Sequence, residues 1–211
     1  MAKTYYLETG STDPTYNLAF EEYVQANRRE GNYLILWQNK NAVIIGSNQN
    51  AGEEINRDFV QQHNIQVVRR NTGGGAVYHD LGNLNYSFIT DSGDLQNRSA
   101  TLFTDPVVKA LRGLGLDSEA SGRNDILVSG CKVSGTAQHL MQGRILHHGT
   151  LLFDSNPEMI AGALRVDPSK FQSKSSKSVR SRIGTIRSAL AQDMDLLQKM
   201  DEDMPVLFIS G

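Results

Sequence analysis

The chain has 211 residues, an apolar content of 39%, and 21 basic against 23 acidic residues, so it can bury a core as one domain and has no overall charge that would attract nucleic acid or an anionic membrane. Its one cysteine, Cys131, cannot form an internal disulfide, and the sequence has neither a signal-peptide pattern nor an apolar run of about 18 residues that could span a membrane. We therefore expect a single cytoplasmic domain over residues 1–211 that binds neither nucleic acid nor membrane.

The N-terminal half contains strand-like and helix-like patterns. Pro14 stands in the first turn of a pattern whose apolar residues recur at helical spacing through Val24. Two apolar runs, 33–37 and 42–45, flank a polar stretch that is typical of a hairpin loop. The predicted elements are a strand at 4–8, a helix from 14 to 24, strands at 33–37 and 42–45, a helix at 54–62, a buried strand at 65–68, and strands at 76–78 and 84–89.

The C-terminal half contains further strands between helices. The predicted elements are a helix at 102–114 closed by Gly115, strands at 126–128, 132–137 and 145–153, a short helix at 157–164, a Ser/Lys-rich loop at 173–178 and a final helix at 183–200. Because strands and helices do not alternate regularly, we expect an α+β fold with mixed or largely antiparallel sheets and flanking helices.

A polar segment, residues 170–182, interrupts this half of the chain. It contains many serines and cations and few apolar residues, so it cannot bury much surface. It is either a solvated loop or a loop that orders over an anionic ligand through Lys174, Lys177, Arg180 and Arg182.

The most informative segment is residues 69–83, which read RRNTGGGAVYHDLGN. Consecutive glycines are costly in backbone entropy, and they make sense where the backbone approaches a ligand closely. Exposed N–H groups of Gly73, Gly74 and Gly75 could meet phosphate or carboxylate oxygens, and Arg70 could pair with the same anion. A plain glycine-rich hairpin with solvated arginines is the alternative. The segment matches neither the P-loop nor the dinucleotide-binding pattern.

Three further segments contain residues that could carry chemistry. Asp125 precedes a predicted strand and could hold Mg²⁺ near a phosphate, or be a turn aspartate satisfied by backbone N–H groups. Lys132 begins an alternating strand and could project into a cleft as a point charge, or be solvated. Cys131 faces the other side of that strand, which predicts a structural cysteine. The adjacent His147 and His148 point to opposite faces, so they do not chelate one metal, and we expect both in the core or at its rim.

In combination and in this order, the segments RRNTGGGAVYHDLGN, GRND, KVSGTA and HHGTLLF resemble the lipoate–protein ligase family. The resemblance begins near residues 14–22, continues through 44–50 and ends around 178–182. It implies the catalytic-domain fold shared by biotin and lipoate ligases. It also implies that lipoic acid and ATP, with Mg²⁺, give lipoyl-adenylate and pyrophosphate. The lipoyl group then passes to a lysine of an apo lipoyl domain of a 2-oxoacid dehydrogenase complex, or of the glycine cleavage H protein.

The resemblance implies a role for Lys132 as the catalytic residue, in contact with both the acyl carbonyl and the phosphate. A fixed cation there would stabilise the charge that develops on the anhydride oxygens during attack. The apolar lipoyl tail is expected in a tunnel of strand side chains. The residues expected to bind ATP and lipoyl-adenylate are Arg70, Gly73, Gly74, Gly75, Ala76, Val77, Tyr78, His79, Asn83, Lys132, Ser134, Gly135 and Thr150.

Members of this family that act alone carry a further small C-terminal domain, whereas this chain ends at Gly211. We therefore expect that domain to be absent or to be a separate protein. We also expect the chain to transfer lipoyl from preformed lipoyl-adenylate better than it adenylates lipoate.

The sequence leaves other functions open. The chain could be a non-catalytic module that binds lipoate or a lipoyl domain. A transferase acting through a cysteine thioester would need Cys131 as its nucleophile, and the Gly-Arg-Gly-Arg loop of biotin ligases does not occur in the sequence.

Overall fold

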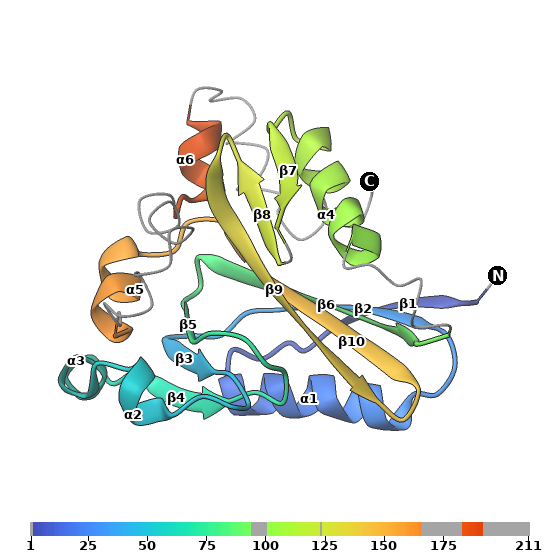
Figure 1. Ribbon diagram of the computed structural model, residues 1–211, viewed down its shortest axis with the longest axis horizontal. Coiled ribbons are helices and arrows are strands. Elements are labelled where there is room, and N and C mark those ends of the chain that lie inside the picture. The colour runs from blue at the N-terminus through green and yellow to red at the C-terminus, as the bar shows by residue number, and fades with distance from the viewer. Residues whose placement is uncertain (1, 94–100, 123, 166–182, 192–211) are drawn as a thin grey trace.

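The computed structural model describes residues 2–93, 101–122, 124–165 and 183–191, and its strands form two sheets (Figure 1). The helices are α1 (Pro14–Asn27), α2 (Ala51–Glu54), α3 (Arg57–Gln62), α4 (Thr101–Gly113), α5 (Pro157–Ala163) and α6 (Ile186–Leu190). The strands are β1 (Thr4–Glu8), β2 (Asn32–Trp37), β3 (Ala42–Ile45), β4 (Gln66–Arg69), β5 (Val77–His79), β6 (Asn83–Asp91), β7 (Ser118–Ser121), β8 (Asp125–Val128), β9 (Cys131–Met141) and β10 (Arg144–Leu152). This mixed architecture confirms the α+β prediction.

The larger sheet has seven strands in the order β1-β2-β6-β10-β9-β8-β7. Only β1 and β2 pair in parallel, and the other neighbours are antiparallel. The turn from β8 to β9 uses Ser129 and Gly130, and the turn from β9 to β10 uses Gln142 and Gly143; all four have positive φ. Two successive positive-φ residues are the mark of a tight hairpin turn whose twist matches that of its strands. These turns fix the register of β9 between its neighbours.

The smaller sheet has three strands in the order β4-β3-β5, with α3 and α5 packed on it. The expected hairpin between residues 33–37 and 42–45 is wrong, because β2 belongs to the larger sheet and β3 to the smaller one. All of β3 is buried, so it needs a partner strand on each side, and it finds them in β4 and β5. The expectation of a buried strand at 65–68 is also wrong, since β4 is an edge strand that faces mostly solvent.

The expected helix at 54–62 is two short helices. Asn50 and Asn56 each cap one of them, accepting hydrogen bonds from Gly52 N–H and Phe59 N–H. An asparagine offers the backbone an alternative to the helical ladder, which explains the break before Asn56. The final helix is described only as α6, beginning after the capping Thr185. Its predicted continuation through 192–200 and the loop at 170–182 lie outside the described residues.

Helix α1 contacts both sheets, touching β6 and β10 of the larger and β4 of the smaller (Figure 1). On the larger sheet, α1 packs over a cluster that includes Val24, Ile35 and Leu146. Helices α4 and α6 cover a separate cluster around Leu111, Ile126 and Ile186. The side chains of α1 can therefore reach the space where the two sheets meet.

No helix within the described ranges is long and apolar enough to cross a membrane.

Candidate functional site

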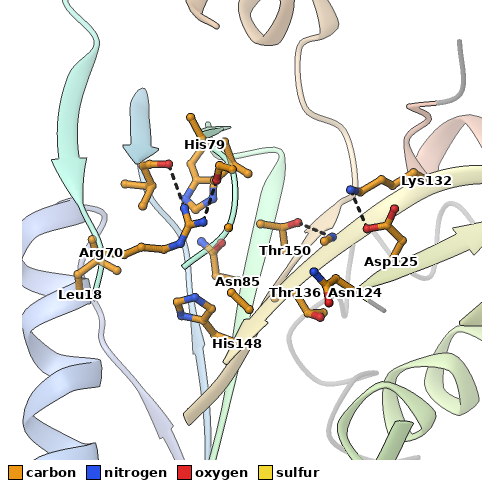
Figure 2. A pocket seen from close by; sticks show the side chains of 18 of the residues that line it. Leu18, Arg70, His79, Asn85, Asn124, Asp125, Lys132, Thr136, His148 and Thr150 are labelled. Carbon is orange, nitrogen blue, oxygen red and sulfur yellow. Dashed lines mark hydrogen bonds and ion pairs between the residues drawn. The ribbon is translucent and has the colours of Figure 1, made fainter. Parts of the chain in front are cut away.

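A cavity of about 220 Å³ opens between the two sheets (Figure 2). One wall is the loop after β4 together with β5, and the other is formed by β9 and β10. Leu18, Trp37 and Ile44 give it an apolar part. The remaining lining residues are Arg70, Gly74, Gly75, Ala76, Val77, His79, Asn85, Asn124, Asp125, Lys132, Gly135, Thr136, Ala137, His148, Gly149 and Thr150.

Most of the site residues expected from the sequence meet in this cavity. They are Arg70, Gly74, Gly75, Ala76, Val77, His79, Asp125, Lys132, Gly135 and Thr150. Gly73 lines a neighbouring hollow instead. Tyr78 lies on the opposite face of β5 from Val77 and His79, and its hydroxyl donates to Asn41 Oδ1 at 3.0 Å.

Asn83 and Ser134 are buried behind the cavity lining. Asn83 Nδ2 donates to Asn85 Oδ1 at 3.0 Å, and Ser134 Oγ lies 3.4 Å from the Tyr86 hydroxyl. Neither side chain reaches the cavity surface, so both support it from behind.

Arg70 organises the glycine loop. Its guanidinium is buried and donates to the carbonyls of Gly73 at 2.7 Å, Gly75 at 2.8 Å and Ile44 at 3.1 Å. Burial lowers the pKa of Arg70 to about 10, and the nearby Glu21 carboxylate opposes that shift. Arg70 thus stays charged at neutral pH while it ties the loop to β3. Gly74 has a φ of +92°, a conformation that a residue with a side chain adopts at a cost.

A buried hydrogen-bond chain connects Arg70 to α1. Arg70 Nε donates to Thr72 Oγ1 at 2.8 Å, and Thr72 Oγ1 lies 2.9 Å from His148 Nε2. His148 Nδ1 lies 2.9 Å from a carboxylate oxygen of Glu21, which also accepts from Ser87 Oγ. With a proton on Nδ1, His148 would donate to Glu21 and its Nε2 would accept from the Thr72 hydroxyl. We call Arg70, Thr72, His148 and Glu21 the buried chain.

Lys132 and Asp125 form an ion pair of 2.8 Å at the other side of the cavity (Figure 2). Their side chains are about one-third exposed, at 31% and 32%. The backbone beside them is fixed, because Thr136 N donates to Asn124 O at 2.8 Å and Gly184 N donates to Lys132 O at 3.1 Å. The ion pair with Asp125 and the fixed backbone together hold the Lys132 ammonium at this side of the cavity.

His79 is neutral in this environment. Burial, together with the nearby charge of Arg70 and the neighbouring His148, lowers its pKa to about 3. The imidazole is 3% exposed and its edge packs against Trp37. The cavity therefore presents His79 as a hydrogen-bonding group, not as a cation.

Sequence reasoning missed several lining residues, including Leu18, Trp37 and Asn85, as well as Glu21 behind them. A signal for Glu21 was available, since it shares a helix face with Leu18 and Val24 at spacings of three residues. A carboxylate on an otherwise apolar helix face needs a buried partner. His148 was expected in the core or at a rim, and it lies in the cavity wall.

Cys131 lies outside the cavity lining. It is half-buried and packs so closely on Gly184 that a Cβ at that glycine would come within 2.8 Å of the cysteine Cβ. The thiol thus has no direct access to the cavity.

No group of three or more His, Cys, Asp or Glu side chains that could hold a metal occurs within the described part of the chain. One carboxylate is nevertheless enough for Mg²⁺ when phosphate oxygens and water complete its coordination. Asp125, with the Asn124 side chain beside it in the lining, fits that kind of site.

Comparison with known proteins gives a consistent result. The family model of the lipoyl protein ligase A/B catalytic domain matches residues 13–203. Lipoate-protein ligase LplJ of Bacillus subtilis is 52% identical over 184 residues, which cover 86% of this chain and 55% of the relative. Lipoate–protein ligase 1 of Staphylococcus aureus is 46% identical over 186 residues, covering 88% and 57%. The chain therefore spans little more than half the length of these curated relatives.

Solved structures agree with the sequence matches. A bi-partite lipoate protein ligase of Thermoplasma acidophilum, described with its E2 lipoyl domain, has a TM-score of 0.76 and 31% identity, covering 95% of this chain and 82% of that chain. A lipoate protein ligase from T. acidophilum with bound lipoic acid gives 0.76 and 28%, covering 94% and 81%. A lipoate-protein ligase A bound with ATP gives 0.73 and 29%, also covering 94% and 81%. These similarities extend over nearly the whole chain, including the segments that form the cavity.

Proposed function

The chain belongs to the lipoyl protein ligase A/B catalytic domain family, and on that premise we propose that it activates lipoic acid with ATP and transfers the lipoyl group to a lysine of an acceptor protein. One observation carries this proposal. A single cavity joins a charged, partly exposed end at Lys132 and Asp125 to a buried end with apolar Leu18 and Trp37. A molecule with a reactive carboxylate and an apolar tail matches both ends.

In the first step, a carboxylate oxygen of lipoate attacks the α-phosphorus of ATP. A mixed anhydride forms, the bond to the β-phosphate bridging oxygen breaks, and pyrophosphate leaves. Lys132 Nζ would neutralise the charge on the carboxylate and the α-phosphate. Fixed cations and N–H groups at such positions are worth more than mobile ones, because they need no reorganisation during the reaction.

The glycine loop is suited to the phosphate side of this step. Arg70 donates hydrogen bonds to the carbonyl oxygens of Gly73 and Gly75, so these partial negative charges point away from the phosphates. Backbone N–H groups of the loop would then be free to face the nucleotide. Arg70 would act mainly by holding the loop, with its charge adding to the local potential.

Asp125 is the residue that would hold Mg²⁺, and the metal would offset the negative charge of the ATP phosphates. The ion pair with Lys132 keeps the Asp125 carboxylate at the cavity edge.

In the second step, the neutral ε-amine of the acceptor lysine attacks the acyl carbonyl. An amide bond forms, the bond to the phosphate oxygen breaks, AMP leaves, and the amine releases a proton. Lys132 would stabilise the oxyanion that develops on the carbonyl. The partial exposure of Lys132 and Asp125 leaves this end accessible to a lysine side chain. We propose an apo lipoyl domain of a 2-oxoacid dehydrogenase complex or the glycine cleavage H protein as the acceptor.

The test is a mass measurement on an acceptor. An apo lipoyl domain is incubated with the chain, lipoate and MgATP, and in a second reaction with preformed lipoyl-adenylate in place of lipoate and ATP. We expect the acceptor to gain the mass of one lipoyl group on its lysine in both reactions. The gain should be faster in the second reaction. An acceptor unchanged in both reactions would contradict the proposal. A gain in the second reaction alone would restrict the chain to the transfer step.

A further inference from the structure

The buried end of the cavity contains two polar groups with unsatisfied hydrogen-bonding capacity. His79 Nε2 and Asn85 Nδ2 are both buried, and neither has a partner among the residues that the structure describes. The two side chains are 3% and 1% exposed, and both line the cavity. A buried polar group left unpaired costs about 1–3 kcal/mol. Two of them at one end of the cavity, one from each sheet, therefore indicate a ligand that completes them.

The hydrogen bonds behind His79 determine where its proton lies. Asn17 Nδ2 donates to the backbone carbonyls of Ser11 and Gln38, so its amide orientation is fixed. The same nitrogen donates to Asn39 Oδ1 at 2.9 Å, which turns Asn39 Nδ2 toward His79 Nδ1 at 3.1 Å. Since Asn39 donates there, His79 Nδ1 must accept. The proton of the neutral imidazole is then on Nε2, and His79 presents a donor.

The Asn85 amide is held from behind by Asn83, whose own Oδ1 has no partner among the described residues. Asn83 Nδ2 donates to Asn85 Oδ1 at 3.0 Å, which leaves the Nδ2 group of Asn85 as the unpaired side of its amide. Asn85 pairs with Trp37 on one neighbouring strand and with Thr150 on the other. The amide donor therefore sits beside the apolar Trp37 in the cavity wall.

Both donors lie away from the reacting end of the cavity. Asn85 is on β6 and Lys132 is on β9, with β10 between them, so two strand spacings separate them, a lateral distance of about 10 Å. Figure 2 shows His79 and Asn85 on the same side as Arg70 and apart from the Lys132–Asp125 pair. An acyl chain whose carbonyl meets Lys132 would bring its far end to these donors.

We propose that His79 and Asn85 determine specificity by donating hydrogen bonds to sulfur at the end of the acyl chain. This inference rests on the proposed function and adds a preference for one kind of acyl chain to it. The disulfide sulfurs of lipoate are weak acceptors, whereas a saturated chain or ring has none and would leave both donors unpaired. The site therefore selects a chain ending in a cyclic disulfide over a hydrocarbon of the same shape.

The sharpest test uses the unaltered protein and two acids of nearly equal shape. Binding of lipoate and of 5-cyclopentylpentanoate, in which methylenes replace the two sulfurs, is measured by isothermal titration calorimetry. We expect lipoate to bind about tenfold more tightly, the factor that one net hydrogen bond supplies. A purely apolar pocket would favour the more hydrophobic carbon ring, so equal or tighter binding of the cyclopentyl acid would overturn the inference. Failure of both acids to bind would overturn the proposed function, and the inference with it.

Substitutions then assign the effect to the two residues. His79→Phe and Asn85→Leu each remove one donor. Each should reduce the preference for lipoate severalfold without weakening the binding of the cyclopentyl acid. Leu18→Ala is the matched control, since it removes an apolar contact from the same cavity. It should weaken the binding of both acids equally. An unchanged preference in folded His79→Phe and Asn85→Leu proteins would contradict the roles of these residues. If either variant does not fold, the comparison of the two acids on the unaltered protein decides.

Discussion

The two ends of the cavity are built differently. At one end, Lys132 and Asp125 form a single ion pair with about one-third of each side chain exposed. At the other, the buried chain of Arg70, Thr72, His148 and Glu21 runs through three structural elements, and each member is less than one-tenth exposed. An exposed ion pair contributes little to stability, whereas a buried network is costly to break. The exposed end can thus be adapted to chemistry, while the buried end maintains the cavity.

This difference predicts that changes at the two ends will separate activity from stability. A substitution at the exposed end should remove turnover from a folded protein. A substitution in the buried chain should first lower the free energy of unfolding.

The largest effect is expected for Lys132→Ala. Loss of a cation that stabilises charge in the transition state should reduce lipoyl transfer about 10²–10³-fold, by analogy with the loss of one oxyanion-hole donor. Because the side chain is partly exposed, the unfolding midpoint in urea should change little. Transfer from preformed lipoyl-adenylate is the measurement, with circular dichroism as the check of folding. Full activity in the folded variant would refute the role of Lys132.

The next effect is expected for Glu21→Ala. The substitution leaves His148 Nδ1 and Ser87 Oγ without their carboxylate partner in a buried site. The free energy of unfolding should fall by roughly 2–6 kcal/mol, because two buried groups lose a partner and each unpaired group costs about 1–3 kcal/mol. Urea unfolding measures the loss. The neighbouring Glu22 is exposed, so Glu22→Ala is the matched control and should be nearly neutral. Equal stability of the two variants would mean that the buried chain does not maintain the cavity.

A smaller effect is expected for Thr72→Val, which keeps the shape of the side chain and removes its hydroxyl. Arg70 Nε and His148 Nε2 then lose a shared partner. We expect a loss of about 1–2 kcal/mol and weaker binding of ATP, because the glycine loop is held less firmly. Thr72→Ser retains the hydroxyl and should preserve both properties. If Thr72→Ser were as damaging as Thr72→Val, packing of the methyl group and not the hydrogen bond would be responsible.

The smallest effect is expected for Cys131→Ser. The thiol is outside the cavity lining and has no path to the acyl carbonyl. Transfer should be unchanged, and stability should change by less than about 0.5 kcal/mol. An acyl thioester trapped on Cys131 in the unaltered protein would instead establish a cysteine-dependent transferase.

The exposed end could be predicted from the sequence better than the buried end. Asp125 and Lys132 stand on adjacent strands of one hairpin, so local patterns bring them together. Glu21, Thr72 and His148 are far apart in the chain, and only the packing of α1 against both sheets unites them. The separation of β2 from β3 into two sheets was missed for a related reason. Their connection resembles a hairpin locally, and the choice of partner strands depends on distant residues.

The orientation of the ligand is the central claim, and a crystal structure with a non-hydrolysable lipoyl-adenylate analogue tests it most directly. We predict the acyl carbonyl oxygen at hydrogen-bond distance, about 3 Å, from Lys132 Nζ. The dithiolane ring should lie between Trp37 and His79, with the adenylate along Gly74 and Gly75. A ligand lying in the reverse direction, with its ring at Lys132 and its phosphate at His79, would contradict this account. The chemistry would then not take place at the exposed end of the cavity, nor would the ring lie at the buried end.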